Sequence, residues 1–296
     1  MSSHPSFTKT YHKASYPAID PSRPELSAKD KTVIVTGAGA GGIGAAVAQA
    51  FAKAGARKIA LVGRTEATLQ QTKDDIVQAH PDATVYVAVA DVSKAENVGI
   101  AAHNIRVELG TWDVFAHCAA VLPRATTLVG ADEDEWFSAF ETNVKFSAHF
   151  AKHFLPKSRP NATYIGINAG AAHVPPSQLP GASAYSASKL AAAKLDEYLA
   201  YENPELRVFT VHPGIVLTNM VRKALGDKKD SLPESILNAP EFPANFLVWL
   251  ASPEADFLRG RYLWANWDVE ELIARKAEIE ANPHLLTITL GGWPFK

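Results

Sequence analysis

Short apolar segments alternate with longer amphipathic segments along most of the chain. The apolar runs have the length of buried strands and cover residues 32–35, 58–62, 84–90, 113–116, 162–167, 206–211 and 261–265. Between them, apolar residues recur at helical spacing at roughly 44–55, 65–80, 94–109, 132–155, 185–202 and 240–251. Parallel strands need helical crossovers, so this alternation predicts a mainly parallel sheet that is covered by helices on both faces.

A change in composition separates the first residues from this pattern. Residues 1–30 are polar and contain several prolines, whereas the alternation begins at Thr32. The 296 residues contain no internal repeat, low-complexity tract or long linker. We therefore expect an N-terminal extension over residues 1–30 and a single doubly wound α/β domain over residues 31–296, with a mainly parallel seven-stranded sheet.

The longest predicted helix covers residues 132–155. Asp132 stands three residues before Glu135, which is the spacing of a capping box, and an apolar stripe begins at Trp136. Asn143 lies inside this predicted helix. Asparagine is unfavourable in a helix interior, so its position there requires a structural or functional cause.

Composition excludes several classes of protein. A formal net charge of −2 gives no reason to expect a nucleic-acid partner. The single cysteine, Cys118, excludes an intrachain disulfide and a cysteine-based metal cluster, and we expect no metal site. No apolar run reaches the length of a membrane span, and the first residues lack the apolar core of a signal peptide. We expect a cytoplasmic protein without a membrane partner.

A glycine-rich stretch, Thr36 to Gly44, follows the first apolar run and opens an alanine-rich helical pattern. The pattern G-x-G-x-x-G fits it in two registers, at positions 37/39/42 and 39/41/44. Strand, glycine loop and helix in this order form a pyrophosphate site, because backbone N–H groups and the helix N-terminus attract the anion. This order predicts a dinucleotide-binding domain of the Rossmann type. The candidate contacts are Gly37, Gly42, Ile43 and Gly44.

The end of the second apolar run indicates which dinucleotide is preferred. A carboxylate there would bind the ribose 2′-hydroxyl of NAD and repel a 2′-phosphate. The chain instead has Gly63-Arg64-Thr65, with no acidic residue before Glu66. Arg64 can form paired hydrogen bonds to a phosphate, and Thr65 adds a hydroxyl. We therefore predict NADP(H); the alternative is that Arg64 is a solvated residue at a helix start.

A second motif, Tyr185-Ser-Ala-Ser-Lys189, places a phenol and an ammonium one turn apart on a helix. A neighbouring ammonium favours the phenolate, so it is expected to lower the tyrosine pKa toward the range of a general acid/base. Alone, such a pair is common and indicates only two exposed helical residues. After a glycine loop, it resembles the short-chain dehydrogenase/reductase family, and the resemblance covers about residues 30–268.

The resemblance implies roles for further residues. Tyr185 would be the acid/base, Lys189 would lower its pKa and hold the nicotinamide ribose, and Asn143 would belong to the proton relay. Asp91 and Val92 would hold the adenine. The stretch Pro213-Gly214-Ile-Val-Leu-Thr218 would contact the nicotinamide carboxamide and the pyrophosphate, and its contact residues would be Pro213, Gly214, Val216 and Thr218. Members of the family pair through the helices that here carry Asn143 and Tyr185, which implies a homodimer or homotetramer.

Three positions depart from the family pattern. Four residues instead of three separate Gly37 from Gly42, and His117-Cys118-Ala-Ala replaces the usual Asn-Asn-Ala-Gly. The third departure is at the position of the family's catalytic serine, which would donate a hydrogen bond to the reacting carbonyl. Here Asn168 is followed by Ala169 at that position. The chain shares this alteration with the uncharacterised fungal members that it resembles. Losing one such donor typically costs about 10² to 10³ in rate. The candidates for a replacement donor are Asn168, His173 and Ser183.

Two functions remain open on these observations. The first is an NADP(H)-dependent oxidoreductase that acts on a carbonyl or alcohol, with Tyr185, Lys189 and Asn143 at its centre. The second keeps the nucleotide-binding scaffold but catalyses a non-redox step, as a cyclase, isomerase or dehydratase. The intact tyrosine and lysine favour the first function, whereas Ala169 favours the second.

The segment after Thr218 carries information on the substrate. It contains the apolar residues Met220, Val221, Leu225 and Leu232, together with a charged stretch at residues 227–230. Such a segment is expected to cover a mainly hydrophobic small organic substrate, although a lid docked on the protein's own core would have the same composition. Prolines at 175, 176 and 180 and Leu179 are expected to form the opposite wall.

Overall fold

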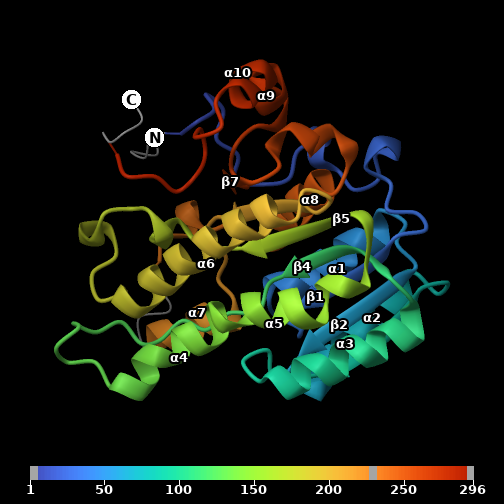
Figure 1. Ribbon diagram of the computed structural model, residues 1–296, viewed down its shortest axis with the longest axis horizontal. Helices are drawn as coiled ribbons and strands as arrows, with labels where there is room; N and C mark the ends of the chain where they lie inside the picture. Colours follow the sequence, from blue (N-terminus) through green and yellow to red (C-terminus); the bar gives the residue numbers. More distant parts are fainter. Residues whose placement is uncertain (1–5, 227–231, 292–296) are drawn as a thin grey trace.

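The computed structural model describes residues 6–226 and 232–291, which contain one seven-stranded sheet in the order β3-β2-β1-β4-β5-β6-β7 (Figure 1). The strands are β1 (Thr32–Thr36), β2 (Lys58–Gly63), β3 (Thr84–Val89), β4 (Trp112–His117), β5 (Ser158–Ile167), β6 (Arg207–His212) and β7 (Arg261–Trp264). Every neighbouring pair is parallel. The predicted α/β, doubly wound Rossmann-type sheet is confirmed, and each of the seven apolar runs overlaps a strand, although β5 begins four residues earlier than predicted.

Helices lie between these strands and after β7. They are α1 (Ile43–Lys53), α2 (Glu66–Ala79), α3 (Ala95–Leu109), α4 (Glu133–Asn143), α5 (Lys145–His153), α6 (Ser183–Glu202), α7 (Asn219–Leu225), α8 (Glu241–Leu250), α9 (Val269–Ala274) and α10 (Lys276–Ala281). Each predicted helical segment contains a helix. The short helices α7, α9 and α10 were not predicted. No helix within the described ranges combines the length and hydropathy needed to cross a membrane.

The helix predicted over residues 132–155 is wrong as a continuous element. The Asp132 carboxylate does cap α4, because Oδ1 accepts the Glu135 N–H at 2.9 Å. However, α4 ends at Asn143, and Val144 (φ −109°, ψ −50°) separates it from α5. Asn143 is therefore a terminal helix residue, and its helical propensity has little bearing on α4.

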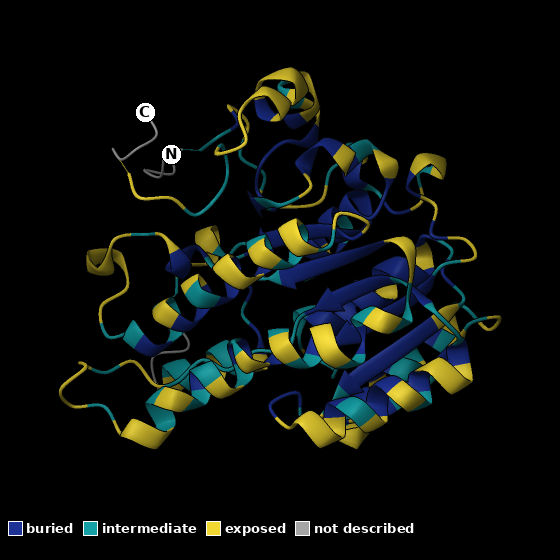
Figure 2. Cartoon of the chain, in the orientation of Figure 1, coloured by how far each residue is buried: buried dark blue, intermediate teal, exposed yellow. Residues whose placement is uncertain are grey.

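The sheet is buried between two helical layers, as Figure 2 shows by its dark blue strands and yellow outer helix faces. Alternate residues of β1 face opposite layers. Val33 and Val35 pack with residues of α1, α2 and α8, whereas Ile34 packs with residues of α3 and α5. Burial on both faces explains why the strands are continuously apolar in sequence.

The strand order reverses between β1 and β4, which places the crevice of this fold at their carboxyl ends. Among the loops that leave the sheet at this edge are those after β1, β4, β5 and β6. They begin with Gly37, Cys118, Asn168 and Pro213, respectively. The topology thus brings the predicted glycine loop and the altered family positions to a single edge.

The N-terminal segment packs onto the chain that follows β7. Tyr11 forms an antiparallel bridge with Trp267. Ile19 and Leu26 are buried in the same core cluster as α1 and α8. The boundary at residue 30 stays a prediction, because the structure does not test whether the remainder folds alone.

Candidate active site

The glycine loop needs glycine at three positions. Gly37 (φ +66°) and Gly41 (φ +81°) adopt left-handed backbone conformations, and a Cβ on Gly44 would lie 2.4 Å from the Gly37 carbonyl oxygen. The loop therefore follows neither predicted register completely. Gly42 is the N-cap of α1 and contributes no side-chain cap, and Ile43 is the first helical residue. The first N–H groups of α1 consequently have no side-chain acceptor and suit an anion.

Arg64 and Thr65 follow β2 and are exposed, and the Thr65 side chain does not cap α2. Asp91 follows the neighbouring strand β3, and its Oδ1 accepts hydrogen bonds from Ser93 N at 2.9 Å and Ser93 Oγ at 2.8 Å. Burial raises the Asp91 pKa, but these hydrogen bonds and the Arg64 charge outweigh it and hold the pKa below its usual value. Val92 is buried beside this carboxylate. An exposed cation and a carboxylate thus lie at the crevice end of β2 and β3.

Tyr185 and Lys189 lie one turn apart near the start of α6. Lys189 is buried, and its Nζ donates a hydrogen bond of 2.8 Å to the Ile167 carbonyl oxygen at the end of β5. The same Nζ lies 5.8 Å from the centre of the Tyr185 ring. Among the described residues, the Tyr185 hydroxyl has no hydrogen-bond partner. The pair is therefore assembled as the sequence predicts, with the phenol available to a ligand.

The predicted lowering of the Tyr185 pKa is wrong for this structure. Burial raises the pKa of Tyr185 to about 12. Burial also lowers the pKa of Lys189 to about 8, although the negative charge of Asp196 opposes this shift. Desolvation disfavours the charged form of both groups and is the largest cause of each shift. At neutral pH the phenol is consequently protonated and suited to donate a proton.

Asn143 holds the tyrosine helix against the loop after β4. Its Oδ1 accepts the Val121 N–H at 2.8 Å, and its Nδ2 donates to the Val121 carbonyl oxygen and to Ser188 Oγ, both at 3.0 Å. Ser188 Oγ in turn donates to the Tyr185 carbonyl oxygen at 2.8 Å. The Asn143 amide is buried, and both its oxygen and its nitrogen are hydrogen-bonded within the protein. Asn143 therefore supports the Tyr185 turn through Ser188.

At the end of β5, the structure places Asn168 and Ala169 beside α6. Asn168 Nδ2 donates to the Lys189 carbonyl oxygen at 2.9 Å, and its Oδ1 accepts the Ala169 N–H at 2.8 Å. The Asn168 amide is thus engaged with the backbone. A site residue that was not predicted from the sequence is Tyr262, whose hydroxyl donates to the Ala169 carbonyl oxygen at 2.7 Å. No local signal in β7 indicates this contact, which joins residues 93 positions apart.

The other two candidate donors, His173 and Ser183, each have a proton left to donate to a substrate. The Trp264 indole N–H donates to His173 Nε2 at 3.1 Å, so neutral His173 carries its proton on Nδ1. Ser183 Oγ accepts an indole N–H from α4 at 3.0 Å and retains its own hydroxyl proton. By contrast, His212 Nδ1 accepts the Gly170 N–H at 3.0 Å, and burial lowers the His212 pKa to about 3. His212 is therefore a neutral support for the loop.

The replaced segment after β4 has a structural role in the sheet. His117 Nδ1 lies 2.8 Å from Thr36 Oγ1 on the paired strand β1, and its ring stacks on Phe146 with centroids 4.0 Å apart. Burial, together with the Lys189 charge, lowers the His117 pKa to about 3. Burial raises the Cys118 pKa to about 12, which makes this thiol unreactive.

Asp196 is a second residue that sequence analysis missed. It is buried on α6, accepts the Thr210 hydroxyl at 2.9 Å, and a Cβ on Gly166 would lie 2.5 Å from its Oδ2. Burial raises the Asp196 pKa to about 7, whereas Thr210 and the Lys189 charge oppose this rise. The sequence signal that could have indicated Asp196 is its seven-residue spacing from Lys189, because this spacing places both residues on one helix face.

The loop after β6 closes the crevice. Pro213 and Val216 are buried, and Gly214 has φ +81°. Thr218 Oγ1 accepts the Val221 N–H at 3.3 Å and so caps α7.

The start of α7 lies against the glycine loop. Asn219 donates to Gly41 through its backbone N–H and to Ala40 through Nδ2, each at 3.4 Å. A hollow of about 610 Å³ opens at this contact, with Gly42, Thr218 and Asn219 in its wall.

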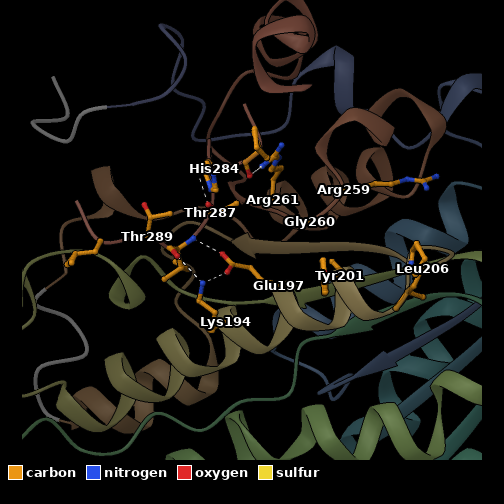
Figure 3. A pocket seen from close by; sticks show the side chains of 15 residues that line it. Lys194, Glu197, Tyr201, Leu206, Arg259, Gly260, Arg261, His284, Thr287 and Thr289 are labelled. Carbon is orange, nitrogen blue, oxygen red and sulfur yellow. Dashed lines mark hydrogen bonds and ion pairs between the residues drawn. The ribbon is translucent and has the colours of Figure 1, made fainter. Parts of the chain in front are cut away.

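A second hollow of about 600 Å³ lies toward the carboxyl end of α6, beneath residues 283–290 (Figure 3). Several of its charged groups are held by neighbouring residues, whereas Arg261 Nε has no hydrogen-bond partner among the described residues. Lys194 pairs with Glu197 and donates to the Ile288 carbonyl oxygen, and Arg261 donates to the Pro283 carbonyl oxygen. In the described part of the chain, no group of three His, Cys, Asp or Glu side chains is placed to hold a metal. The crevice with Tyr185 is therefore the candidate active site.

The family model described as short chain dehydrogenase matches residues 31–229. The chain belongs to the short-chain dehydrogenase/reductase family. It is 36% identical over 286 residues to the short chain dehydrogenase/reductase AacuD of Aspergillus aculeatus, and the match covers 96% of each chain. As a member of this family, the protein is an oxidoreductase of the NAD(P)(H)-using class.

Solved structures show the same short-chain dehydrogenase/reductase fold. A dehydrogenase/reductase from Sinorhizobium meliloti is 27% identical and superposes with a TM-score of 0.71 over 84% of this chain and 97% of its own. The L-sorbose reductase of Gluconobacter frateurii, solved with NADPH and L-sorbose, is 24% identical and has a TM-score of 0.71 over 81% and 96% of the two chains. At that identity, the second likeness concerns the fold alone.

Proposed function

We propose that this protein is an NADP(H)-dependent oxidoreductase that acts on the carbonyl or alcohol group of a mainly hydrophobic small organic substrate. The observation that carries the proposal is the hydroxyl of the half-buried residue Tyr185, which has no hydrogen-bond partner among the described residues and lies one turn from buried Lys189. A protonated phenol in this position can donate to a carbonyl oxygen that gains negative charge.

The residues of the crevice fit NADP(H). The open N-terminus of α1 suits the pyrophosphate, and Gly37, Gly42, Ile43 and Gly44 would surround it. Arg64 and Thr65 are exposed where the ribose 2′-phosphate would lie, and Asp91 with Val92 would hold the adenine. Pro213, Gly214, Val216 and Thr218 would flank the nicotinamide end.

The chain's own residues then perform the proton chemistry. When bound, NADPH supplies a hydride equivalent. Tyr185 donates its proton to the substrate oxygen during reduction and is left as the phenolate, and in the reverse direction this phenolate takes up the proton of the alcohol. Lys189, whose pKa is about 8, keeps a positive charge beside the phenol at neutral pH. Asn143 fixes the Tyr185 turn through Ser188.

The walls of the crevice support a mainly hydrophobic substrate. No residue of α7 is fully buried, and its apolar residues Met220, Val221 and Leu225 are each partly exposed. Leu179 on the opposite segment is 42% exposed. Apolar groups left accessible on both sides favour substrate contact over a docked lid. The charged stretch at residues 227–230 lies outside the described residues.

A non-redox step on the same scaffold is the second candidate. It is favoured by Ala169, which offers no hydroxyl where the substrate carbonyl would be fixed. Anaerobic titration with NADPH and NADH, followed by single-turnover reactions with a panel of carbonyl substrates, distinguishes the two. Oxidation of one NADPH per product formed supports the oxidoreductase. Product formation without NADPH oxidation contradicts it.

A further inference from the structure

Two buried asparagine side chains pack directly against Gly214 in the loop after β6. A Cβ on Gly214 would lie 2.2 Å from Asn238 Oδ1 and 3.2 Å from Asn266 Oδ1. Asn238 is 6% exposed and Asn266 is 1% exposed. Such close packing leaves Gly214 no room for a side chain, so the position of the loop depends on where the two amides lie.

Asn238 connects this loop to the N-terminal part of the chain. Its backbone N–H donates to the Ile215 carbonyl oxygen at 2.7 Å, and its Oδ1 accepts the Ile215 N–H at 3.0 Å. Its Nδ2 donates to the Lys13 carbonyl oxygen at 2.9 Å. The Asn238 side chain thus fixes the loop on one side and residue 13 on the other.

Asn266 makes a second connection to the same N-terminal segment. It exchanges two hydrogen bonds of 2.8 Å with the backbone of His12, one through Nδ2 and one through its own carbonyl oxygen. Within the described ranges, its Oδ1 has no hydrogen-bond partner, and it faces Gly214. Both asparagines therefore lie between Gly214 and residues 12–13.

We define residues 7–16 as the N-terminal strap. Side chains along its length fasten it to the segment after β7. The contacts are the Arg275 guanidinium over the Phe7 ring at 3.5 Å, the Glu271 carboxylate with the N–H groups of Lys9 and Thr10, His12 Nε2 with Asp268 Oδ2 at 2.7 Å, and the Tyr16 hydroxyl with the Val269 N–H at 2.9 Å. The strap is thus a fixed support for the two asparagines.

The supported loop continues into the crevice. Four residues after Gly214, Thr218 caps α7, whose first residue Asn219 donates to the glycine loop. We propose that Asn238 is a positioning residue for the cofactor, and that it acts with the strap to hold the loop from Pro213 to Thr218 in the shape that receives the nicotinamide half of NADP(H). This inference rests on the proposed function.

The test compares two ligands in the full-length chain. NADPH carries both halves, whereas adenosine 2′,5′-bisphosphate carries the adenine and the 2′-phosphate without the nicotinamide. Asn238→Asp keeps the acceptor for Ile215 but removes the donor to the Lys13 carbonyl oxygen, so the link to the strap is lost. We expect its Kd for NADPH to rise about tenfold. The Kd for the bisphosphate should stay within about twofold.

Asn203→Asp is the matched control. It removes an Asn Nδ2 donor to the Leu199 carbonyl oxygen, a bond of 2.9 Å at the end of α6, away from the loop. Its thermal stability should fall while both dissociation constants are retained. His12→Phe is a second, milder variant, because His12 is partly exposed, and a phenyl ring can keep its stacking on Tyr16 while losing the bond to Asp268. It should weaken NADPH binding about twofold to threefold in the same selective manner.

The positioning role is overturned if Asn238→Asp weakens the binding of NADPH and of the bisphosphate equally, or if it weakens the binding of neither. If Asn238→Asp fails to fold, the His12→Phe result decides, and an unchanged NADPH affinity there overturns the proposal. A wild-type chain that binds neither NADPH nor NADH overturns the proposed function together with this inference. Tight wild-type binding with unaffected variants overturns this inference alone.

Discussion

Lys189 and Asp196 lie seven residues apart on one buried face of α6, and the charge of each stabilises the charge of the other. Burial lowers the Lys189 pKa to about 8 and raises the Asp196 pKa to about 7. Without the carboxylate, the lysine would lose its proton at still lower pH. Asp196 therefore helps to keep Lys189 cationic beside Tyr185 at neutral pH.

This relationship predicts the effect of Asp196→Asn on the pH profile. In the wild type, kcat/KM for carbonyl reduction should fall above about pH 8, as Lys189 loses its proton. In the variant, the amide carries no charge to oppose desolvation of the lysine. We expect the alkaline limb to move about one unit toward lower pH. Steady-state kinetics across neutral and alkaline pH measure this shift.

Asp113→Asn is the control for that experiment. Asp113 lies at the amino end of β4, where its carboxylate accepts the Thr32 N–H, and its substitution should leave the alkaline limb in place. An unshifted limb in Asp196→Asn would show that Lys189 does not govern the profile, or that Asp196 is uncharged at that pH.

Arg64→Ala tests the cofactor preference. Arg64 is exposed directly after β2, and no acidic residue precedes Glu66 in this turn. A hydrogen bond between a guanidinium and a phosphate contributes about 1.5–3 kcal/mol. NADPH binding should therefore weaken by about 10- to 150-fold, while NADH binding stays nearly constant. Fluorescence titration with both cofactors measures the difference, and Arg106→Ala on the exposed side of α3 controls for a general loss of positive charge.

Equal loss of NADPH and NADH affinity in Arg64→Ala would contradict the 2′-phosphate assignment. The remaining candidate for that contact would then be Thr65. The sequence alone supports Arg64 because the type of residue at this strand end decides which ribose substituent is tolerated.

Hydrophobic periodicity predicted the strands well because parallel strands are buried on both faces and have a strong apolar signal. It failed at Val144, where the apolar pattern continues although the helix stops. At this point Asn143, in the last turn of α4, binds the backbone of Val121 from another loop, a contact that hydrophobic periodicity does not reveal. The helices α7, α9 and α10 are too short for a clear period, and contacts such as Arg275 with Glu278 support them.

The site residues show a similar limit. Tyr185 and Lys189 were found because one helix carries both, so their spacing survives in the sequence. Tyr262 was missed because its contact with Ala169 depends on β7 lying beside β6, which lies beside β5. The direction of the Tyr185 pKa shift was also missed, because the degree of burial of a side chain follows from the complete fold.

The exposed side of α6 predicts self-association. Leu190, Leu195 and Tyr198 are 41%, 38% and 56% exposed, and Phe137 on the adjacent α4 is 58% exposed. Apolar side chains gathered on packed helices favour a homodimer or a homotetramer. Leu190→Glu should therefore lower the molar mass measured by light scattering after size exclusion. Val107→Glu, at a position on α3 that is 67% exposed, should not lower it. A wild-type protein that is monomeric at micromolar concentration would contradict this expectation.

Tyr185→Phe tests the acid/base directly. The variant keeps the ring that lies near Lys189 and removes only the hydroxyl that has no partner in the described structure. Loss of a general acid typically costs about 10² to 10⁴ in rate. NADPH binding should persist while turnover falls by that factor. Retained turnover would assign the proton donor to another group, for which His173 Nδ1 and the Ser183 hydroxyl are available.

Ala169→Ser distinguishes the two candidate functions. Ala169 has an extended backbone, with φ −152° and ψ 145°, that accepts serine without strain, and its carbonyl oxygen is already held by Tyr262. If the protein reduces a carbonyl with one donor fewer, the new hydroxyl should hold or raise kcat, by up to about 10²-fold. The rise in kcat should disappear in the double variant with Tyr185→Phe, because the new hydrogen-bond donor cannot replace the group that transfers the proton. In a non-redox enzyme, Ala169→Ser should leave NADPH unconsumed and turnover unchanged or lower. NADPH oxidation that increases in Ala169→Ser and vanishes in the double variant therefore establishes reduction through Tyr185.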